Sequence, residues 1–431
     1  MQRGSNRREF LKTAGAAAAG AVAASSAIVG RAHAAGSDIL KIGLIGCGGR
    51  GTGAGGDALG ADPNSRLVAV ADAFPDRIQS CLSALKHRYQ DRVAVDDTHT
   101  FVGFDACEKL IASGVDVVLL ATPPHFRPMH LKACIEAGKH VFCEKPVAVD
   151  APGVRSVLAT VDLAAQKNLN LVSGLCWRYD YGVRETMKRV LDGAIGEIVA
   201  MQETYNTGTL WERPREPNWT EMQFQLRNWL YFTWLSGDHN VEQHIHSLDK
   251  ASWAMHDQPP LKAWGLGGRQ CRTDPRFGDI FDHHAVCYEY AGGVRLYSYC
   301  RQMANCSSEV TDIFHGTKGR ADILANRIHG PNEWRYNGLK PGMYSVEHQE
   351  LFAAIRSGKT INNGLYMARS TMLAILGRMA TYSGKVITWD EAINSKISLT
   401  PSAYTMDATP PTVRGADGRY PIAVPGSTKV V

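Results

Sequence analysis

The chain has 431 residues, of which 44% are hydrophobic and 21% charged, a composition typical of a globular protein with more than one domain. Its formal net charge is +5, but residues 1–34 contribute +4, so the nearly neutral remainder gives no support for nucleic-acid binding. No run of eighteen apolar residues follows residue 34, which argues against stable membrane insertion.

Residues 1–34 have the pattern of an export signal. A charged start is followed by a weakly apolar Ala/Gly-rich stretch and by the small-x-small sequence Ala32-His33-Ala34. The pair Arg7-Arg8 resembles a twin-arginine (Tat) signal. A retained membrane anchor is the alternative, but the stretch is barely apolar enough for it. We therefore predict a Tat signal peptide, a partner in the Tat export machinery, and a periplasmic or otherwise exported mature protein.

The ten cysteines include no C-x-x-C pair, which disfavours a redox motif or a zinc ribbon. Tat substrates cross the membrane already folded, so these thiols are first buried in a reducing compartment. We expect isolated core thiols rather than disulfides.

The mature chain opens with a glycine-rich turn in the setting of a dinucleotide site. A β-rich run at 39–45 leads into Gly46-x-Gly48-x-x-Gly51, a helix is expected next, and a second strand ends at Asp72, 21 residues past Gly51. The turn predicts amide contacts to a pyrophosphate. Asp72 is placed to bind the adenosine ribose hydroxyls and repels a 2′-phosphate, so NAD is favoured, with NADP possible. The predicted cofactor residues here are Gly46, Gly48, Gly49, Arg50, Gly51 and Asp72.

Alternating strands and helices continue through the first half, as expected for a parallel Rossmann sheet. Expected strands cover 116–123, 139–146 and 169–175, and expected helices cover 125–137 and 151–166.

Four segments together carry a family resemblance: GLIGCGGRG, ATPPHFRPMH, AGKHVFCEKPV and DGAIGEIV. They resemble the Gfo/Idh/MocA oxidoreductases, named for glucose–fructose oxidoreductase and inositol dehydrogenase, from about Leu40 to about Ile393. The resemblance implies an α/β protein with a second α/β domain on an open, mostly antiparallel sheet. The inner face of that sheet covers the nicotinamide, and its outer face commonly forms oligomer contacts, so a homo-oligomer is expected.

The second half agrees with this implied fold. Segments 196–205, 283–301 and 307–316 have strand patterns, the middle one a hairpin turning at Gly292-Gly293. The predicted divisions are 1–34 signal peptide, 35–175 NAD(P)-binding Rossmann domain, 176–395 substrate and oligomerisation domain, and 396–431 C-terminal tail.

The E-K-P motif at Glu144-Lys145-Pro146 carries the family's implied chemistry. By resemblance, Lys145 lies beside the nicotinamide and the reacting carbinol, Glu144 helps to position it, and Pro146 holds the turn, often as a cis peptide. Glu144 and Lys145 therefore join the predicted cofactor residues. A buried lysine at this position can favour the developing alkoxide.

The family's D-x-G-x-H-x-x-D segment falls on residues 242–249, which aligns His246 with the catalytic histidine. Glu242 replaces the usual aspartate and His244 replaces a glycine. On a continuous helix Glu242 shares a face with His246, so we expect it to orient the imidazole or to accept substrate hydroxyls. We predict Lys145, His246 and Glu242 as catalytic, with His246 as base or relay and also in contact with substrate. A structural core histidine is the alternative.

A metal site is the rival interpretation of this segment. His239, Glu242 and His246 would share one helical face and their ligand types suit zinc. The H-E-x-x-H spacing is absent and the resembled family requires no metal, so no metal is predicted.

Other candidates flank the cofactor. Thr122, Pro123 and His125 are predicted to line its pocket, with simple helix capping as the alternative. A strand end at 169–175 directs Trp177, Arg178 and Tyr179 toward the cleft, where substrate contact competes with packing. The aromatic residues of 227–240 could stack on sugar rings or pack in the core; they are Trp229, Tyr231, Phe232 and Trp234.

These observations predict an exported NAD(P)-dependent oxidoreductase that takes hydride from a secondary alcohol of a sugar, polyol or glycoside. Export removes the enzyme from the cytoplasmic nicotinamide pool, so tightly bound, internally recycled cofactor is expected. The alternatives are an NAD-dependent glycosidase or epimerase with redox-neutral turnover, and a non-catalytic sugar-binding member of the fold.

Overall fold

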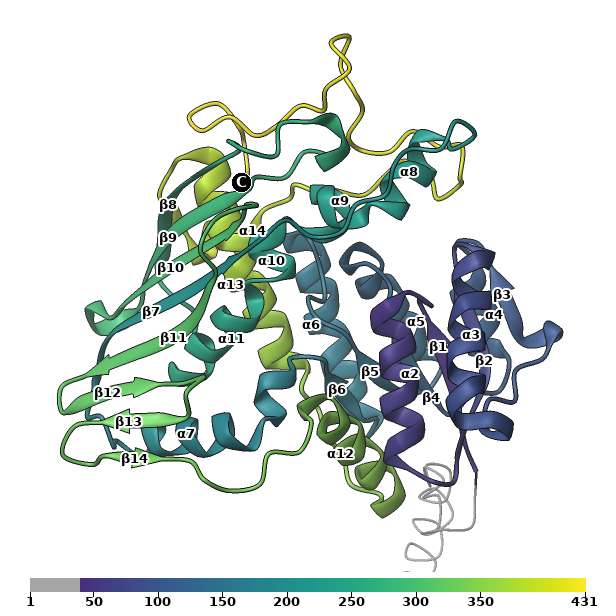
Figure 1. The fold of residues 1–431 in the computed structure, drawn as a ribbon, viewed down its shortest axis with the longest axis horizontal. Coiled ribbons are helices and arrows are strands. Elements are labelled where there is room, and N and C mark those ends of the chain that lie inside the picture. Colours follow the sequence, from purple (N-terminus) through teal and green to yellow (C-terminus); the bar gives the residue numbers. More distant parts are fainter. Residues whose placement is uncertain (1–38) are drawn as a thin grey trace, which may run out of the picture.

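The structure, a computed structural model, describes residues 39–431 (Figure 1). The predicted Tat signal at 1–34 lies outside the described residues. Within the described part, no helix is both long and apolar enough for a membrane crossing. All ten cysteines lie in this part, are free, and are mostly buried, which confirms the expectation of core thiols.

The first half folds around a parallel sheet. Its strands are β1 Leu40–Ile45, β2 Ser65–Asp72, β3 Thr100–Val102, β4 Val117–Leu120, β5 His140–Cys143 and β6 Leu171–Ser173. Their spatial order is β3-β2-β1-β4-β5-β6, and every pair is parallel. These strands are short apolar runs with few exposed residues, because helices cover both faces of the sheet.

The helices around this sheet follow the predicted alternation. They are α2 Gly49–Ala61, α3 Pro75–Tyr89, α4 Ala106–Ala112, α5 Arg127–Glu136 and α6 Ala151–Gln166. The helix predicted at 151–166 has the observed bounds, with the Asp150 carboxylate capping it through the Gly153 N–H. The predicted Rossmann domain is confirmed.

The second half contributes a nine-stranded sheet. Its strands are β7 Ile198–Thr207, β8 Lys262–Gly268, β9 His283–Glu289, β10 Arg295–Gln302, β11 Glu309–Gly316, β12 Gly319–Asp322, β13 Arg327–His329, β14 Trp334–Arg335 and β15 Ile387–Thr388. The order is β14-β13-β12-β11-β7-β10-β9-β8-β15, antiparallel except for the β10–β7 pair. The hairpin of β9 and β10 turns at Ala291–Gly293, as predicted.

Helices fill the space between the two sheets (Figure 1). They include α7 Tyr181–Leu191, α10 His239–Glu242, α11 Ile245–Ala254 and α13 Gly364–Ser383. α13 is buried over most of its length and packs on α6, α11 and β8, so it joins the two halves in one core.

One helix of the second half returns to the Rossmann sheet. α12 Met343–Ser357 packs on α2, and its Leu351 and Phe352 share a core with β1 and β4. The first hydrophobic core is therefore completed by residues far beyond 175. No local sequence pattern predicts that α12 packs on the first domain, because an apolar helix face looks the same whichever domain it covers.

The remaining helices and the tail lie at the carboxyl edge of the parallel sheet. α8 Glu221–Arg227 and α9 Thr233–Ser236 stand beside the segment 396–431, while α14 Trp389–Asn394 precedes it (Figure 1). The tail is fastened by side chains: Gln225 donates to the Thr412 carbonyl at 2.7 Å, and the Thr412 hydroxyl donates to Asp279 at 2.9 Å.

Candidate active site

The glycine turn between β1 and α2 is shaped for the approach of a phosphate. Gly46 has a φ of +95°, and a Cβ there would lie 2.6 Å from the main chain of Ala121. A Cβ on Gly51 would lie 1.8 Å from the Gly46 carbonyl oxygen, so only glycine allows this close packing. A Cβ on Gly48 or Gly49 would meet nothing within 4 Å, and α2 has no side-chain cap. The first amides of α2 are thus open to an anion.

Asp72 ends β2 beside this turn. Its Oδ2 accepts a hydrogen bond from the Cys47 N–H at 2.7 Å, and its Oδ1 accepts one from the Phe74 N–H at 3.0 Å. Burial raises the pKa of the Asp72 carboxyl above its ordinary value, against the effect of these two hydrogen bonds. The carboxylate keeps lone pairs for further donors, which fits the predicted contact with ribose hydroxyls.

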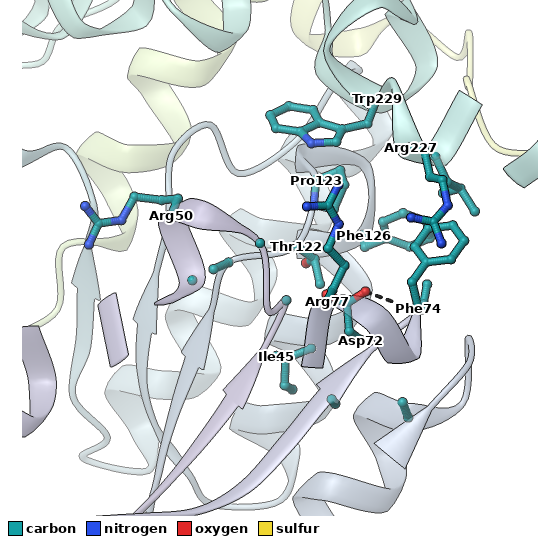
Figure 2. A pocket seen from close by; sticks show the side chains of 18 of the residues that line it. Ile45, Arg50, Asp72, Phe74, Arg77, Thr122, Pro123, Phe126, Arg227 and Trp229 are labelled. Carbon is teal, nitrogen blue, oxygen red and sulfur yellow. Dashed lines mark hydrogen bonds between the residues drawn. The ribbon is translucent and has the colours of Figure 1, made fainter. Parts of the chain in front are cut away.

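A cavity of about 500 Å³ runs along the carboxyl ends of these strands (Figure 2). The glycine turn, Asp72, Thr122 and Pro123 form one wall, as predicted. The other wall comes from the second half of the chain. The sequence indicated Trp229, which lines the cavity, only as a residue that could stack on a sugar ring or pack in the core. Residues of the cavity that the sequence did not predict include Arg77, Trp211, Arg213 and Arg227. They come from segments far apart in the chain, and no motif marks them.

Arg50 and Glu144 connect the glycine turn to the E-K-P turn. Figure 2 shows the Arg50 side chain pointing away from the other labelled residues. Its Nε lies 3.1 Å from Glu144 Oε1, and its Nη2 donates to Asp57 at 2.9 Å. Glu144 Oε2 in turn accepts from the Lys145 N–H at 3.2 Å. The buried Glu144 thus sets the spacing of the two loops, while any cofactor contact of Arg50 or Glu144 stays a prediction.

His125 lies behind the cavity wall rather than on it. Its Nε2 is 2.8 Å from the Tyr404 hydroxyl of the tail, and its ring packs edge-on against Trp234. Burial lowers the pKa of His125 to about 4, so the ring is neutral. The structure therefore does not place His125 at the cofactor cavity with Thr122 and Pro123.

The aromatic segment near α9 is divided between core and cavity. Tyr231, Phe232 and Trp234 are buried in one hydrophobic cluster, so the core interpretation holds for these three. Trp229 lines the cofactor cavity, and Figure 2 shows its ring above Pro123.

Lys145 is held by Glu242 at the carboxyl end of β5. The Lys145 ammonium donates to Glu242 Oε1 at 2.8 Å and to the Glu242 main-chain carbonyl at 2.6 Å. Both side chains are mostly buried, with 13% and 15% exposed. The Lys145–Pro146 peptide bond is cis, as the resemblance implied. The two contacts to Glu242 fix both the position and the orientation of the Lys145 ammonium.

His246 and Glu242 do not share one helix, contrary to the sequence-based expectation. α10 ends at Glu242 and α11 begins at Ile245, so a turn at Gln243-His244 separates them. The Glu242 carboxylate therefore contacts Lys145 and does not orient the imidazole. At this turn His244 is buried, and its Nε2 lies 2.6 Å from the Ser298 hydroxyl on β10. This contact explains the presence of a histidine at position 244.

His246 lies close to two lysines at the start of α11. Burial, together with the charges of Lys145 and Lys250, holds the pKa of His246 well below its ordinary value, so the ring is neutral near pH 7. Its Nδ1 is buried and has no hydrogen-bond partner among the described residues. A neutral imidazole next to a lysine ammonium has the charge state that a proton acceptor needs.

A buried charged group lies beneath His246, and the sequence did not predict it. Lys250 Nζ contacts Asp312 at 3.0 Å and donates to the His246 main-chain carbonyl at 2.5 Å, with 1% and 0% of the Lys250 and Asp312 side chains exposed. Glu203 stands opposite Asp312 in the β7–β11 register. Burial, reinforced by the Asp312 charge, raises the pKa of Glu203 well above its ordinary value. When Glu203 is protonated and neutral, the positive charge of Lys250 is balanced by the negative charge of Asp312.

The turn Cys176–Tyr179 follows β6, but its polar groups are engaged within the protein. The Arg178 guanidinium forms two hydrogen bonds from Nε to the Asp249 carboxylate, at 3.0 and 3.1 Å, and one from Nη2 to Asp257 at 2.5 Å. It also lies 3.8 Å from the Tyr366 ring centroid. The Tyr179 hydroxyl donates to Asn363 at 2.6 Å. These contacts are those of packing residues, and substrate binding by Trp177, Arg178 and Tyr179 stays a prediction.

The metal-ligand set considered from the sequence is not assembled. Within residues 39–431, the side chains that could share an ion are Asp238, His239 and His284, without Glu242 or His246.

Comparisons with known proteins agree with this geometry. Residues 40–174 match the Gfo/Idh/MocA family model, described as an oxidoreductase family with an NAD-binding Rossmann fold. The chain is 29% identical over 282 residues to inositol 2-dehydrogenase of Rhizobium meliloti (strain 1021), covering 65% of this chain and 74% of that protein. It is 27% identical over 227 residues to 2,7-anhydro-N-acetylneuraminate hydratase of Escherichia coli (strain K12), covering 52% and 55%.

The fold is also found among solved structures. Aldose-aldose oxidoreductase from Caulobacter crescentus, complexed with glycerol, superposes with a TM-score of 0.62 at 20% identity, over 81% of this chain and 99% of that chain. This likeness establishes the two-domain architecture.

Proposed function

Because residues 40–174 match the Gfo/Idh/MocA oxidoreductase model with its NAD-binding Rossmann fold, we propose that the chain is an oxidoreductase of this family and that it oxidises a secondary alcohol of a sugar, polyol or glycoside. The observation that carries the proposal is the Lys145–Glu242 pair, set beside a neutral His246 at the carboxyl end of β5. The residues around the glycine turn suit NAD, because the amides of α2 are open and Asp72 faces the cavity.

The protein residues have separate roles in this proposal. NAD, when bound, supplies the hydride acceptor. The Lys145 ammonium stabilises the alkoxide that forms as the substrate hydroxyl loses its proton. His246 Nε2 takes that proton, since Nδ1 is buried. Glu242 is a positioning residue that keeps the ammonium directed at the reacting oxygen.

We further propose that the cofactor is held tightly and recycled in place. Arg227 of α8 donates to the Asp76 carboxylate of α3 at 2.7 and 3.0 Å, and its guanidinium lies 4.0 Å from the Phe74 ring centroid. Arg227 and Phe74 both line the cavity, so this clasp joins the two domains across its mouth. Exit of the cofactor requires the clasp to open.

Tat export is a proposal that fits retained cofactor. The pair Arg7-Arg8 and the small-x-small site at Ala32-His33-Ala34 support it. A folded protein that carries its own NAD needs no nicotinamide pool at its destination.

We propose that the outer face of the large sheet binds a second copy of the chain. Apolar residues of β7, β8 and β10 are exposed there, among them Val199, Leu266, Tyr297 and Tyr299, with Leu266 78% exposed. Light scattering on the purified protein tests this, since a monomer at micromolar concentration would contradict it.

Redox-neutral turnover is the second candidate function. The hydratase relative favours it, because a hydratase adds or removes water without net oxidation. Transient oxidation would acidify a neighbouring C–H, and the Lys145 and His246 roles would be unchanged. A non-catalytic sugar-binding role is disfavoured by the presence of both residues.

The test is a purification of the mature protein without added cofactor, followed by a screen of sugars, polyols and aryl glycosides with absorbance recorded near 340 nm. Bound NAD and a rise with one compound class support net oxidation, and product formation without a lasting rise supports redox-neutral turnover. Lys145→Ala should abolish both the rise in absorbance and product formation, while NAD stays bound. Lys139→Ala, at the opposite end of β5, is the matched control. A protein that neither holds, binds nor reduces NAD contradicts the proposal.

A further inference from the structure

Three buried metal-binding side chains meet outside the hydride-transfer site. Asp238 precedes α10, His239 begins it, and His284 lies on β9. His239 Nδ1 is 2.7 Å and His284 Nε2 is 3.3 Å from the same oxygen, Asp238 Oδ1, and all three ligand atoms lie within 4.8 Å of one another. Each of the three side chains is 0% exposed.

In the Nδ1–H tautomer, His284 directs a lone pair at this oxygen. The Thr381 hydroxyl donates to main-chain carbonyls of its own helix, at Arg378 3.1 Å away or Gly377 3.2 Å away. When it does so, it accepts from His284 Nδ1, which lies 2.9 Å away. The Nδ1–H tautomer leaves Nε2 as an acceptor facing a carboxylate oxygen, and two acceptors face each other stably only with a cation between them.

His239 lacks hydrogen-bond partners among the described residues at both of its ring nitrogens. The 2.7 Å contact to Asp238 lacks hydrogen-bond direction. A buried polar group without a partner destabilises the fold, because it has lost its hydrogen bonds to water. A shared cation would engage both His239 and His284.

The other atoms of the cluster are arranged as the outer contacts of a metal site usually are. Asp238 Oδ2 accepts from the Phe281 N–H at 2.9 Å and from the Tyr382 hydroxyl at 2.5 Å, while Oδ1 accepts from the His239 main-chain N–H and keeps a further lone pair for the cation. The Thr381 contact likewise orients His284. Metal-binding histidines and carboxylates are commonly fixed by such second bonds.

The nearby arginines do not supply hydrogen bonds to His239 or His284. Arg272 donates to Gln302 and to the Phe281 carbonyl, and Arg378 donates to the carbonyls of Val149 and Gly237. These donors are therefore engaged with other acceptors, and neither arginine forms a hydrogen bond with His239 or His284.

We propose that Asp238 Oδ1, His239 Nδ1 and His284 Nε2 bind a divalent transition-metal ion of the zinc type. The site is enclosed and does not line the cofactor cavity, so its role is structural. It ties the start of α10 to β9, and α10 ends at Glu242, the partner of Lys145. This departs from the sequence-based prediction of no metal, and of the residues weighed there only His239 is shared.

The experiment is metal analysis of the full-length protein, purified with NAD bound, dialysed, and then supplied with Zn²⁺ or Co²⁺ and desalted. About one ion per chain should be retained, with visible Co²⁺ bands of a nitrogen- and oxygen-ligated ion. His284→Gln should retain none. His283→Gln, the next residue on β9 with a half-exposed side chain, should retain the full amount.

A second measurement keeps the test decisive if His284→Gln folds poorly. A chelator should lower the melting temperature of the wild-type protein by several degrees, and Zn²⁺ should restore it. No retained metal and no chelator effect in the wild-type protein would overturn the proposal. Metal retained equally by His284→Gln would overturn it as adventitious binding.

Discussion

The Lys145 ammonium makes two contacts to one residue, at 2.8 Å to the Glu242 carboxylate and at 2.6 Å to the Glu242 carbonyl. The second contact does not depend on the side chain. Glu242 thus holds the ammonium both by charge and by main-chain geometry, and the two contributions can be separated by substitution.

Glu242→Gln removes the negative charge and keeps the carbonyl contact. We expect kcat to fall about 10- to 100-fold, with NAD content and KM little changed, because only the direction and charge balance of the ammonium are affected. Glu242→Asp should recover part of the loss. Steady-state kinetics with the best substrate of the screen measure this. A rise in KM at constant kcat would instead make Glu242 a substrate-binding residue.

The pH dependence should reflect the lowered pKa of His246. A proton acceptor works in its neutral form, and burial keeps His246 neutral below the ordinary histidine pKa of about 6.5. Therefore kcat/KM should stay level from pH 8 through 6.5 and decline only at lower pH. Circular dichroism at each pH controls for unfolding. A decline centred at 6.5 would mean that the proton acceptor is not shielded as the structure indicates.

Arg227→Gln should weaken cofactor retention. It removes the Asp76 ion pair and the contact with Phe74, of which Asp76 is half exposed, so we expect NAD to dissociate about three- to tenfold faster. Arg276→Gln, which breaks the pair with Glu212, is the control. NAD content after timed gel filtration measures the effect, and equal loss from both variants would exclude the clasp.

Lys250→Met should destabilise the fold by about 3–5 kcal/mol, because it leaves the buried Asp312 carboxylate without its partner. Lys250→Met combined with Asp312→Asn should recover much of that loss, since no unpaired charge remains. Urea unfolding provides the free energies. A double variant as unstable as the single one would show that packing, and not charge, dominates there.

The first domain could be predicted because its determinants are local. Gly46, Gly51 and Asp72 lie in a short stretch whose strand–turn–helix context is readable from the sequence, and α6 was predicted to the residue. Lys145 was identified through its motif. Each of these inferences rests on neighbouring residues and on backbone conformations that few sequences permit.

The rest of the site depends on contacts between distant segments. The sequence predicts that His239, Glu242 and His246 share one helical face, but the helix is interrupted at Gln243-His244, where His244 contacts Ser298, and Glu242 contacts Lys145. Arg227 lies at the cavity and Asp312 lies beneath His246 because segments distant in the sequence pack together. The periodicity of the sequence does not predict such long-range packing. The His125–Tyr404 contact, across most of the chain, is of the same kind.

The central claim is hydride transfer assisted by Lys145. The most direct measurement mixes NAD-loaded protein rapidly with a sugar deuterated at the oxidised carbon and follows absorbance at 340 nm in a single turnover. We predict a rise slower than with the protonated sugar, deuterium recovered in the bound nicotinamide, and no rise in Lys145→Ala at equal NAD content. The claim of hydride transfer would be contradicted if the absorbance rose at the same rate with the deuterated and the protonated sugar, or if deuterium were found only in the solvent. The role of Lys145 would be contradicted if Lys145→Ala reacted at the same rate as the wild-type protein.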